Sequence, residues 1–515
     1  MAQTPTALHA TADGGVGPDA LTDVELRRLV LGTLFPGFEG TTAPTWLLEL
    51  LRDGLAGVVL FERNVSTRDP DGSVAALSTQ LRQARPAVIV AVDEEGGDVT
   101  RLDAARGSDV PGAAALGVVN DPGLTRRVAG YLGSRLQAAG VSLNLAPVAD
   151  VDADPQNPII GIRSFGSDPE AVAAHVAGFV HGQQTQGVAA TVKHFPGHGA
   201  TVEDSHVTVP SVDVSLQQLR HRELVPFRSA VAAGTQVVMT AHVRYPALDD
   251  VPATLSRPIL TDLLRGELGF EGVVMTDGLD MNAISQTVGH EEGAVQALLA
   301  GADALCVGGE STGPQIVERL VAGVTAAVRS GRLPVSRLLD ATHRVGVLAA
   351  WTREPVEPSG EHGSGVEAAR RALRASGQVR LDRAPLVLEL HDEPSIAAGE
   401  VPWAIGAPLT ERFTGTVVEV LTPQDSDPAP ALARHADRPV VLAVRGVRRR
   451  AWQRHVLASV RAARPDVVVV DHELPGDESL LGPNHLLTFS GSLVSAEVAA
   501  DVLAGRGDVA GLRTI

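Results

Sequence analysis

Residues 193–206 carry the densest group of reactive side chains in the sequence. They read KHFPGHGATVEDSH and include one lysine, three histidines and one aspartate. Gly197 and Gly199 let the backbone turn sharply and approach a ligand closely. Asp204 and His206 are two residues apart, so in a turn both side chains can point into one cavity. A carboxylate on one imidazole nitrogen fixes the tautomer, which leaves the other nitrogen free to move a proton at neutral pH.

This segment admits three interpretations. Its polar side chains could be solvated loop residues. His194, His198, Asp204 and His206 are also legal metal ligands, although their spacing matches no strong metal-binding pattern. The third interpretation is a sugar-binding site with a His–Asp dyad, and the density of the cluster favours it over a solvated loop.

Asp277 lies in the middle of a second segment that could carry chemistry, VVMTDGLDM at residues 273–281. An apolar strand there leads to an aspartate with Gly278 beside it. A carboxylate at the end of such a strand can attack a carbon centre. The alternative interpretation of Asp277 is a helix N-cap.

Three further strand ends carry polar residues. Asp93 begins the run DEEGG and is followed by Arg101, and a carboxylate suits a neutral polyol because it accepts hydrogen bonds from two hydroxyls. Arg163 lies in an irregular segment after another strand, whereas His242, taken alone, fits a satisfied core histidine. A nucleophilic carboxylate, a separate proton donor and hydroxyl-binding groups are what glycoside hydrolysis requires.

The elements that must position these residues alternate between strands and helices. The apolar runs mostly lack strict alternation, which is typical of parallel strands buried on both faces. Helical patterns lie between them, at 45–52, 124–139, 168–185 and 215–233. Eight strands alternating with helices predict a (β/α)₈ barrel of the TIM type, with an open doubly wound sheet as the alternative. The predicted strands are 34–38, 57–61, 87–93, 142–151, 189–195, 236–243, 272–277 and 302–307.

The length of 515 residues exceeds what one hydrophobic core normally supports. Residues 352–365 have the Pro, Gly and Glu content of a linker. We expect a disordered tail at 1–20, the catalytic barrel at 21–351 and a smaller three-layer α/β domain at 366–515. The last of these contains no catalytic cluster that we recognise.

Composition excludes several function classes. The net charge of −18 argues against nucleic acid or an anionic membrane as the main partner. Cys306 is the single cysteine, so no intramolecular disulfide can form. No signal peptide and no apolar run of about 20 residues are evident, which predicts a cytoplasmic protein. No cofactor is expected, and the sequence does not indicate an oligomeric state.

Lys193 is the only lysine among the 43 basic residues. Lysine presents a compact point charge, whereas arginine presents a wide planar fork, so a narrow site can require lysine. The alternative is that one lysine survived by chance in a chain that otherwise uses arginine.

Several of these motifs resemble those of the β-N-acetylglucosaminidases of glycoside hydrolase family 3. Residues 193–206 resemble the KHFPGHG…DSH motif of that family, and DEEGG at 93–97 is similar to its D-Q/E-E-G-G. NLAPVADV at 144–151, RSFG at 163–166 and TDGLDM at 276–281 resemble three more of its motifs. The resemblance covers most of residues 30–350.

The resemblance implies a role for each matching position. Asp277 is expected to be the nucleophile of a retaining exo-glycosidase, with His206 as acid/base and Asp204 as its partner. The expected ligands of the N-acetylglucosamine unit are Asp93, Arg101, Arg163, Lys193 and His194. The expected substrates are glycosides that end in β-linked N-acetylglucosamine, such as cell-wall fragments or chitooligosaccharides.

The sequence departs from the family at two positions and leaves three alternatives open. Asp98 stands where the family often has Arg, and Gly278 replaces a second Asp beside the nucleophile. Within the family, the alternative is a phosphorylase, because a neutral imidazole does not repel an anionic acceptor. Outside it, the alternatives are a metal-dependent barrel hydrolase using His194, His198 and His206, and a sugar-binding protein without catalysis.

Overall fold

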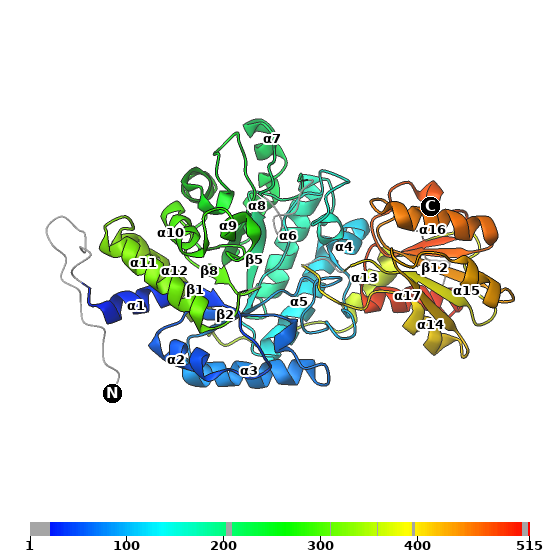
Figure 1. The fold of residues 1–515 in the computed structure, drawn as a ribbon, viewed down its shortest axis with the longest axis horizontal. Helices are drawn as coiled ribbons and strands as arrows, with labels where there is room; N and C mark the ends of the chain where they lie inside the picture. Colours follow the sequence, from blue (N-terminus) through cyan, green and yellow to red (C-terminus); the bar gives the residue numbers. More distant parts are fainter. Residues whose placement is uncertain are drawn as a thin grey trace.

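The structure is a computed structural model that describes residues 21–201, 209–309, 311–357, 359–393 and 397–506, with the backbone of 513–514. Two bodies lie side by side in Figure 1: a barrel built from the blue to green part of the chain, and a smaller domain built from the yellow to red part. The tail predicted at 1–20 lies outside the described residues.

The first body is a (β/α)₈ barrel, as predicted. Strands β2 to β7 form a parallel sheet in sequence order, and β1 pairs in parallel with β8. A bridge between Met275 and Ala304 connects β7 to the chain entering β8 and continues the curved wall. The strands are β1 (Leu34–Pro36), β2 (Gly57–Leu60), β3 (Ile89–Val92), β4 (Leu143–Asn144), β5 (Ala189–Phe195), β6 (Val237–Thr240), β7 (Val273–Met275) and β8 (Leu305–Val307).

Every residue of these eight strands is buried, which explains why the apolar runs lack alternation. Helices cover the outside of the barrel (Figure 1). They are α1 (Asp23–Leu31), α2 (Thr45–Asp53), α3 (Pro70–Ala84), α4 (Ala113–Val119), α5 (Pro122–Ala138), α6 (Pro169–Gln184), α7 (Leu216–His221), α8 (Leu224–Ala232), the π-helix η5 (Pro258–Glu267), α9 (Asn282–Ser285), α10 (His290–Ala300), α11 (Pro314–Arg329) and α12 (Val335–Trp351).

Two helix predictions illustrate the local rules. Asp168 caps α6 by accepting a hydrogen bond from the Glu170 amide at 3.1 Å, as its position before Pro169 suggested. The single helix predicted at 215–233 is instead two helices, α7 and α8. In one continuous helix Pro226 would offer no amide hydrogen to the Arg222 carbonyl and its ring would clash with that carbonyl, so the chain breaks at 222–223, one turn before Pro226.

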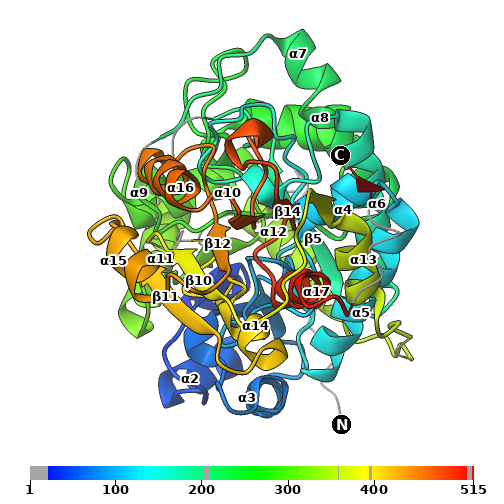
Figure 2. The same cartoon turned by 90° about the vertical axis from the view of Figure 1, so that its right-hand side faces the viewer.

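The second domain has three layers, as predicted. Its sheet has the order β11–β10–β12–β13–β14–β9–β15 and is parallel except for the β14–β9 pair. Helices α15 and α16 pack on one face, whereas α14 and α17 pack on the other (Figure 2). The elements are α13 (Ser364–Ala372), β9 (Arg374–Ser376), β10 (Leu386–Leu390), α14 (Gly406–Arg412), β11 (Val417–Leu421), α15 (Ala429–Arg434), β12 (Val440–Val444), α16 (Ala451–Ala463), β13 (Val468–Asp471), β14 (His485–Leu487), α17 (Leu493–Leu503) and β15 (Arg513–Thr514).

Helix α13 joins the two bodies. It packs against α4 and α5 of the barrel and against α17 of the second domain. Two ion pairs cross this junction: Arg127 with Glu367 at 2.8 Å and Arg371 with Asp121 at 2.7 Å. Within the described part of the chain, no helix combines the length and the apolar character needed to cross a bilayer.

Candidate active site

A cavity of about 260 Å³ lies at the carboxyl ends of the barrel strands. Residues at the ends of the strands and in the loops that follow them line it, and one wall comes from the second domain at Ala397 and Gly399. Six of the residues predicted from the sequence line it: Asp93, Arg101, Arg163, Lys193, His194 and Asp277. The remaining two, Asp204 and His206, lie outside the described residues.

Lys193 is the centre of a charged array on one side of this cavity. Its Nζ lies 2.7 Å from Asp93 Oδ1 and 2.7 Å from Glu95 Oε1. Glu95 also accepts both arms of the Arg163 guanidinium, at 2.8 and 3.0 Å. The two carboxylates and two cations therefore neutralise one another, and each fixes the position of the next.

The charges in this array are stable despite burial. Burial alone would raise the pKa of Glu95, but Arg163 and Lys193 more than offset it and hold that pKa well below its usual range. Burial alone would likewise lower the pKa of Lys193, yet Asp93 and Glu95 raise it overall. All four side chains thus present fixed donors and acceptors, and sugar hydroxyls are groups that such an array can bind.

His194 is oriented by a carboxylate that the sequence analysis did not single out. Asp150 Oδ2 lies 2.7 Å from His194 Nδ1, and Asp150 Oδ1 accepts from the backbone amide of His198 at 2.7 Å. Burial disfavours the charged form of Asp150, but His194 and then His198 lower its pKa overall, so it is an ionised acceptor. The Nδ1 of His194 must therefore donate, so Nε2 is the ring nitrogen left to contact a ligand.

His198 lies next to this pair but is not a proton donor at neutral pH. Burial, and next the neighbouring His194, lower the pKa of His198 to about 4. The rings of His194 and His198 meet edge to face, with centroids 5.9 Å apart. Within the described residues, no three His, Cys, Asp or Glu side chains are grouped as metal ligands.

Asp277 follows β7 and is half-buried in the cavity wall. The Gly278 amide donates to its Oδ1 at 2.8 Å, and the Gly278 carbonyl accepts from His242 Nε2 at 2.8 Å. The Nδ1 of His242 pairs with the Thr254 hydroxyl at 2.7 Å. His242 is thus a buried structural histidine, as predicted, and it braces the turn that presents Asp277.

Arg101 lies between the barrel and the second domain. Its guanidinium donates to the Ala397 carbonyl at 2.9 Å and lies 3.8 Å from Asp93 Oδ2. Its backbone amide donates to Glu94 Oε2 at 2.9 Å. Burial, and next Asp103, raise the pKa of Glu94 to about 7. Arg101 is therefore partly occupied in holding the second domain against the cavity.

Asp98, which departs from the motif that this part of the sequence resembles, has a partner in the second domain. It forms an ion pair with Arg445, and its Oδ1 accepts from the Gly491 amide at 2.9 Å. Arg445 also lies over the Trp403 ring, 5.6 Å from its centroid. The acidic residue at 98 is thus explained by docking of the second domain, a signal that the barrel sequence alone does not contain.

Comparison with known proteins agrees with this geometry. Residues 41–348 match the sequence profile of the glycosyl hydrolase family 3 N-terminal domain. The chain belongs to glycoside hydrolase family 3. Its barrel therefore carries the cavity of a glycoside hydrolase, and the cavity's position at the carboxyl ends of the strands is where barrel enzymes place their active sites.

Individual relatives narrow the comparison for this family 3 enzyme. A β-hexosaminidase of Stenotrophomonas maltophilia (strain K279a) is 42% identical over 266 residues, 50% of this chain and 77% of the relative. One from Xylella fastidiosa (strain M23) is 40% identical over 284 residues, 53% of this chain and 82% of the relative. A solved family 3 β-N-acetylglucosaminidase from Paenibacillus sp. str. FPU-7 is 33% identical, with a TM-score of 0.83, and covers 95% of this chain and 98% of its own.

Proposed function

We propose that this glycoside hydrolase is a retaining exo-β-N-acetylglucosaminidase. The observation that carries the proposal is that the Asp277 carboxylate lines the same cavity as the Lys193 array. In this proposal the Lys193 array binds the sugar, and Asp277 supplies the attacking carboxylate. The names of the β-hexosaminidase and β-N-acetylglucosaminidase relatives support the same substrate class.

In the proposed first step, Asp277 attacks the anomeric carbon as the glycosidic bond breaks. The leaving oxygen takes a proton from His206, whose tautomer Asp204 fixes. The product is a glycosyl-aspartate ester. In the second step His206 removes a proton from water, which attacks the anomeric carbon and releases Asp277. The roles of Asp204 and His206 rest on the sequence motif.

The sugar-binding roles follow from the donors and acceptors on the cavity wall. Asp93 accepts from hydroxyls, whereas Lys193 and Arg163 donate to hydroxyl or carbonyl oxygens. Asp150 accepts the hydrogen bond of His194 Nδ1, so Nε2 is the ring nitrogen that contacts the sugar. Arg101 contributes from the edge next to the second domain. Terminal N-acetylglucosamine of cell-wall muropeptides or chitooligosaccharides is the proposed substrate, and the cytoplasmic location remains a prediction of the sequence.

Product analysis on 4-nitrophenyl N-acetyl-β-glucosaminide, with and without phosphate, tests this function. Release of N-acetylglucosamine with retained configuration supports the proposal. Release of N-acetylglucosamine 1-phosphate in phosphate buffer identifies the phosphorylase alternative instead. Absence of both products, with turnover of a glucoside, would overturn the substrate assignment.

Trapping with a fluorinated N-acetylglucosaminide tests the nucleophile separately. Mass spectrometry of the labelled peptide is expected to place the sugar on Asp277. Asp280 is an internal control, because it lines the same cavity but accepts from the Ser311 amide at 3.0 Å. Label on Asp280 or on Asp93 would contradict the mechanism while leaving the substrate assignment intact.

A further inference from the structure

The segment that carries Arg163 is an irregular loop without strand support. Asn157 Oδ1 accepts from the amides of Ile159 and Ile160, both at 2.9 Å. The loop then turns at Gly161, whose φ is +44°, and continues into a single 3₁₀ turn, Gly161–Arg163. Its shape therefore depends on a few hydrogen bonds centred on Asn157.

Asn157 also connects this loop to the one after β5. Its Nδ2 donates to the His198 carbonyl at 2.9 Å, and the side chain is fully buried. His198 and Arg163 both line the cavity. A shift of Asn157 would thus move two walls of the cavity together.

Arg449 of the second domain contacts Asn157 directly. The guanidinium of Arg449 donates to the Asn157 carbonyl at 2.6 Å and forms an ion pair with Glu473. The Glu473 side chain is only 4% exposed. A Cβ on Gly161 would lie 3.9 Å from both Arg449 Nη1 and Glu473 Oε1, so the pair rests directly on the turn before Arg163.

We propose that Arg449, held by Glu473, is a positioning residue that sets the loop carrying Arg163 from outside the barrel. The idea rests on the proposed function in so far as Arg163 binds the sugar. It makes the second domain a working part of the active site, although that domain contains no residue expected to touch the reacting atoms. Misplacement of a positioning loop by about 1 Å can cost on the order of 100-fold in rate.

A double-mutant cycle tests the coupling. Arg449→Ala is expected to lower kcat/KM about 10- to 100-fold. In an Arg163→Ala background the same change is expected to have less than about a threefold effect, because the group it positions is gone. Arg449→Lys can reach the Asn157 carbonyl or Glu473 but not both, so an intermediate loss is expected. Equal losses in both backgrounds would overturn the proposal.

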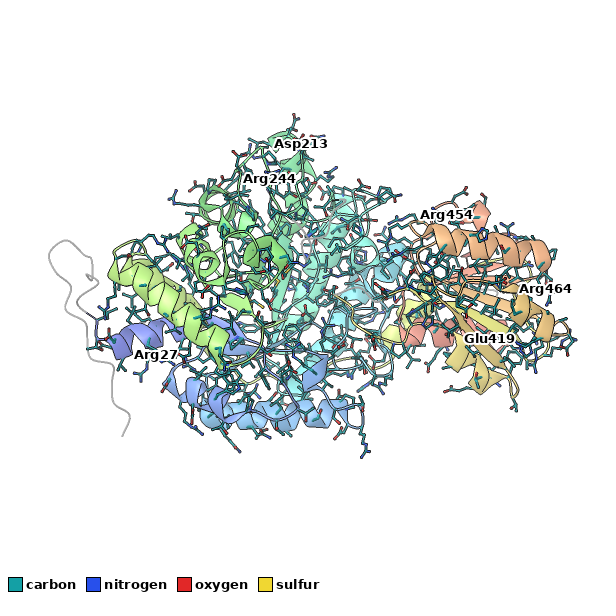
Figure 3. The ribbon with its side chains drawn as sticks, viewed as in Figure 1. Arg27, Asp213, Arg244, Glu419, Arg454 and Arg464 are labelled. Atoms are coloured by element: carbon teal, nitrogen blue, oxygen red, sulfur yellow. The ribbon has the colours of Figure 1, made fainter. Side chains whose placement is uncertain are left out.

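Matched controls separate positioning from general docking. Arg371→Ala removes another ion pair between the two bodies, with Asp121 at 2.7 Å. Glu419, labelled within the second domain in Figure 3, pairs with Arg434 at 2.6 Å. Arg371→Ala and Glu419→Gln are expected to keep kcat/KM within about threefold of the parent, whereas Glu473→Gln is expected to resemble Arg449→Ala.

Hydrogen exchange gives a readout that needs no substrate. Arg449→Ala is expected to accelerate exchange at the amides of Ile159 and Ile160 about tenfold or more, while Arg371→Ala leaves them unchanged. Unchanged exchange in Arg449→Ala would refute the positioning role even if the substrate proved to be a different sugar. A parent enzyme that releases no N-acetylglucosamine would refute the proposed function alone.

Discussion

Replacing Lys193 by arginine is expected to inactivate the enzyme almost as fully as replacing it by alanine. The Lys193 ammonium contacts Asp93 and Glu95, each at 2.7 Å, and its side chain is 3% exposed. Two hydrogen bonds to charged groups contribute about 1.5–3 kcal/mol each. Their loss in Lys193→Ala therefore corresponds to roughly 10²- to 10⁴-fold in kcat/KM if it is expressed in the transition state.

Arginine keeps the charge but not the geometry. The planar guanidinium has to fit between the two carboxylates that contact the single Nζ of Lys193. Both oxygens of one of them, Glu95, already accept hydrogen bonds from Arg163. We expect Lys193→Arg to lie within about tenfold of Lys193→Ala in kcat/KM. Arg220→Lys, at an exposed pair with Glu267, is the control for the exchange itself.

Steady-state kinetics and thermal unfolding together decide this prediction. The raised pKa of Lys193 means that its charge is present through neutral pH and its contribution is lost only as pH rises through that folded value. The loss in the mutants should therefore be the same at pH 6 and pH 8. A Lys193→Arg enzyme with near-parental kcat/KM would refute the argument from pocket width.

Four other outcomes are expected. Asp277→Asn should abolish turnover while leaving the melting temperature within a few degrees, measured by calorimetry. His206→Ala should lose about 10²- to 10⁴-fold on alkyl glycosides but far less on dinitrophenyl glycosides, and equal losses would exclude the acid role. Glu94→Gln should raise the free energy of unfolding at pH 8 by up to about 3 kcal/mol. The reason is that ionising a carboxyl whose folded pKa is about 7 lowers the stability of the folded protein as pH rises from 4.5 towards 7. The stabilisation by the mutation should therefore fade by about pH 5. Chelation should leave activity unchanged, and full loss that zinc reverses would favour the metal-dependent alternative.

The barrel was predictable because its signals are local. All eight strands lie inside the predicted runs, and 189–195 has the predicted bounds. The run at 142–151 was wrong in length, since only Leu143–Asn144 is a regular strand, although Val148 still forms a bridge to Lys193. Apolar content alone does not distinguish a short buried strand from the buried loop that follows it.

Six of the residues that line the cavity were predictable, but the groups that hold them were only partly so. Glu95 could have been found, since in an extended chain residues 93 and 95 point the same way. Asp150 lay in a quoted motif, although only the fold brings it to His194. Nothing in the sequence indicated that Arg449 lies near the cavity, because its contact with residue 157 depends on how the two domains dock.

The wall formed by Ala397 and Gly399 has a consequence for how this enzyme can change. A Cβ on Gly399 would lie 2.7 Å from Glu62 Oε2, so the wall is seated tightly against the loop after β2 as well as against Arg101. Neither body encloses the cavity alone. A barrel excised at the linker would have a cavity that is open on one side. A substitution on one side of the contact between the two bodies has to be accompanied by a compatible residue on the other side. Directed evolution for a new sugar would therefore progress faster with libraries that vary the two halves jointly than with libraries confined to the barrel.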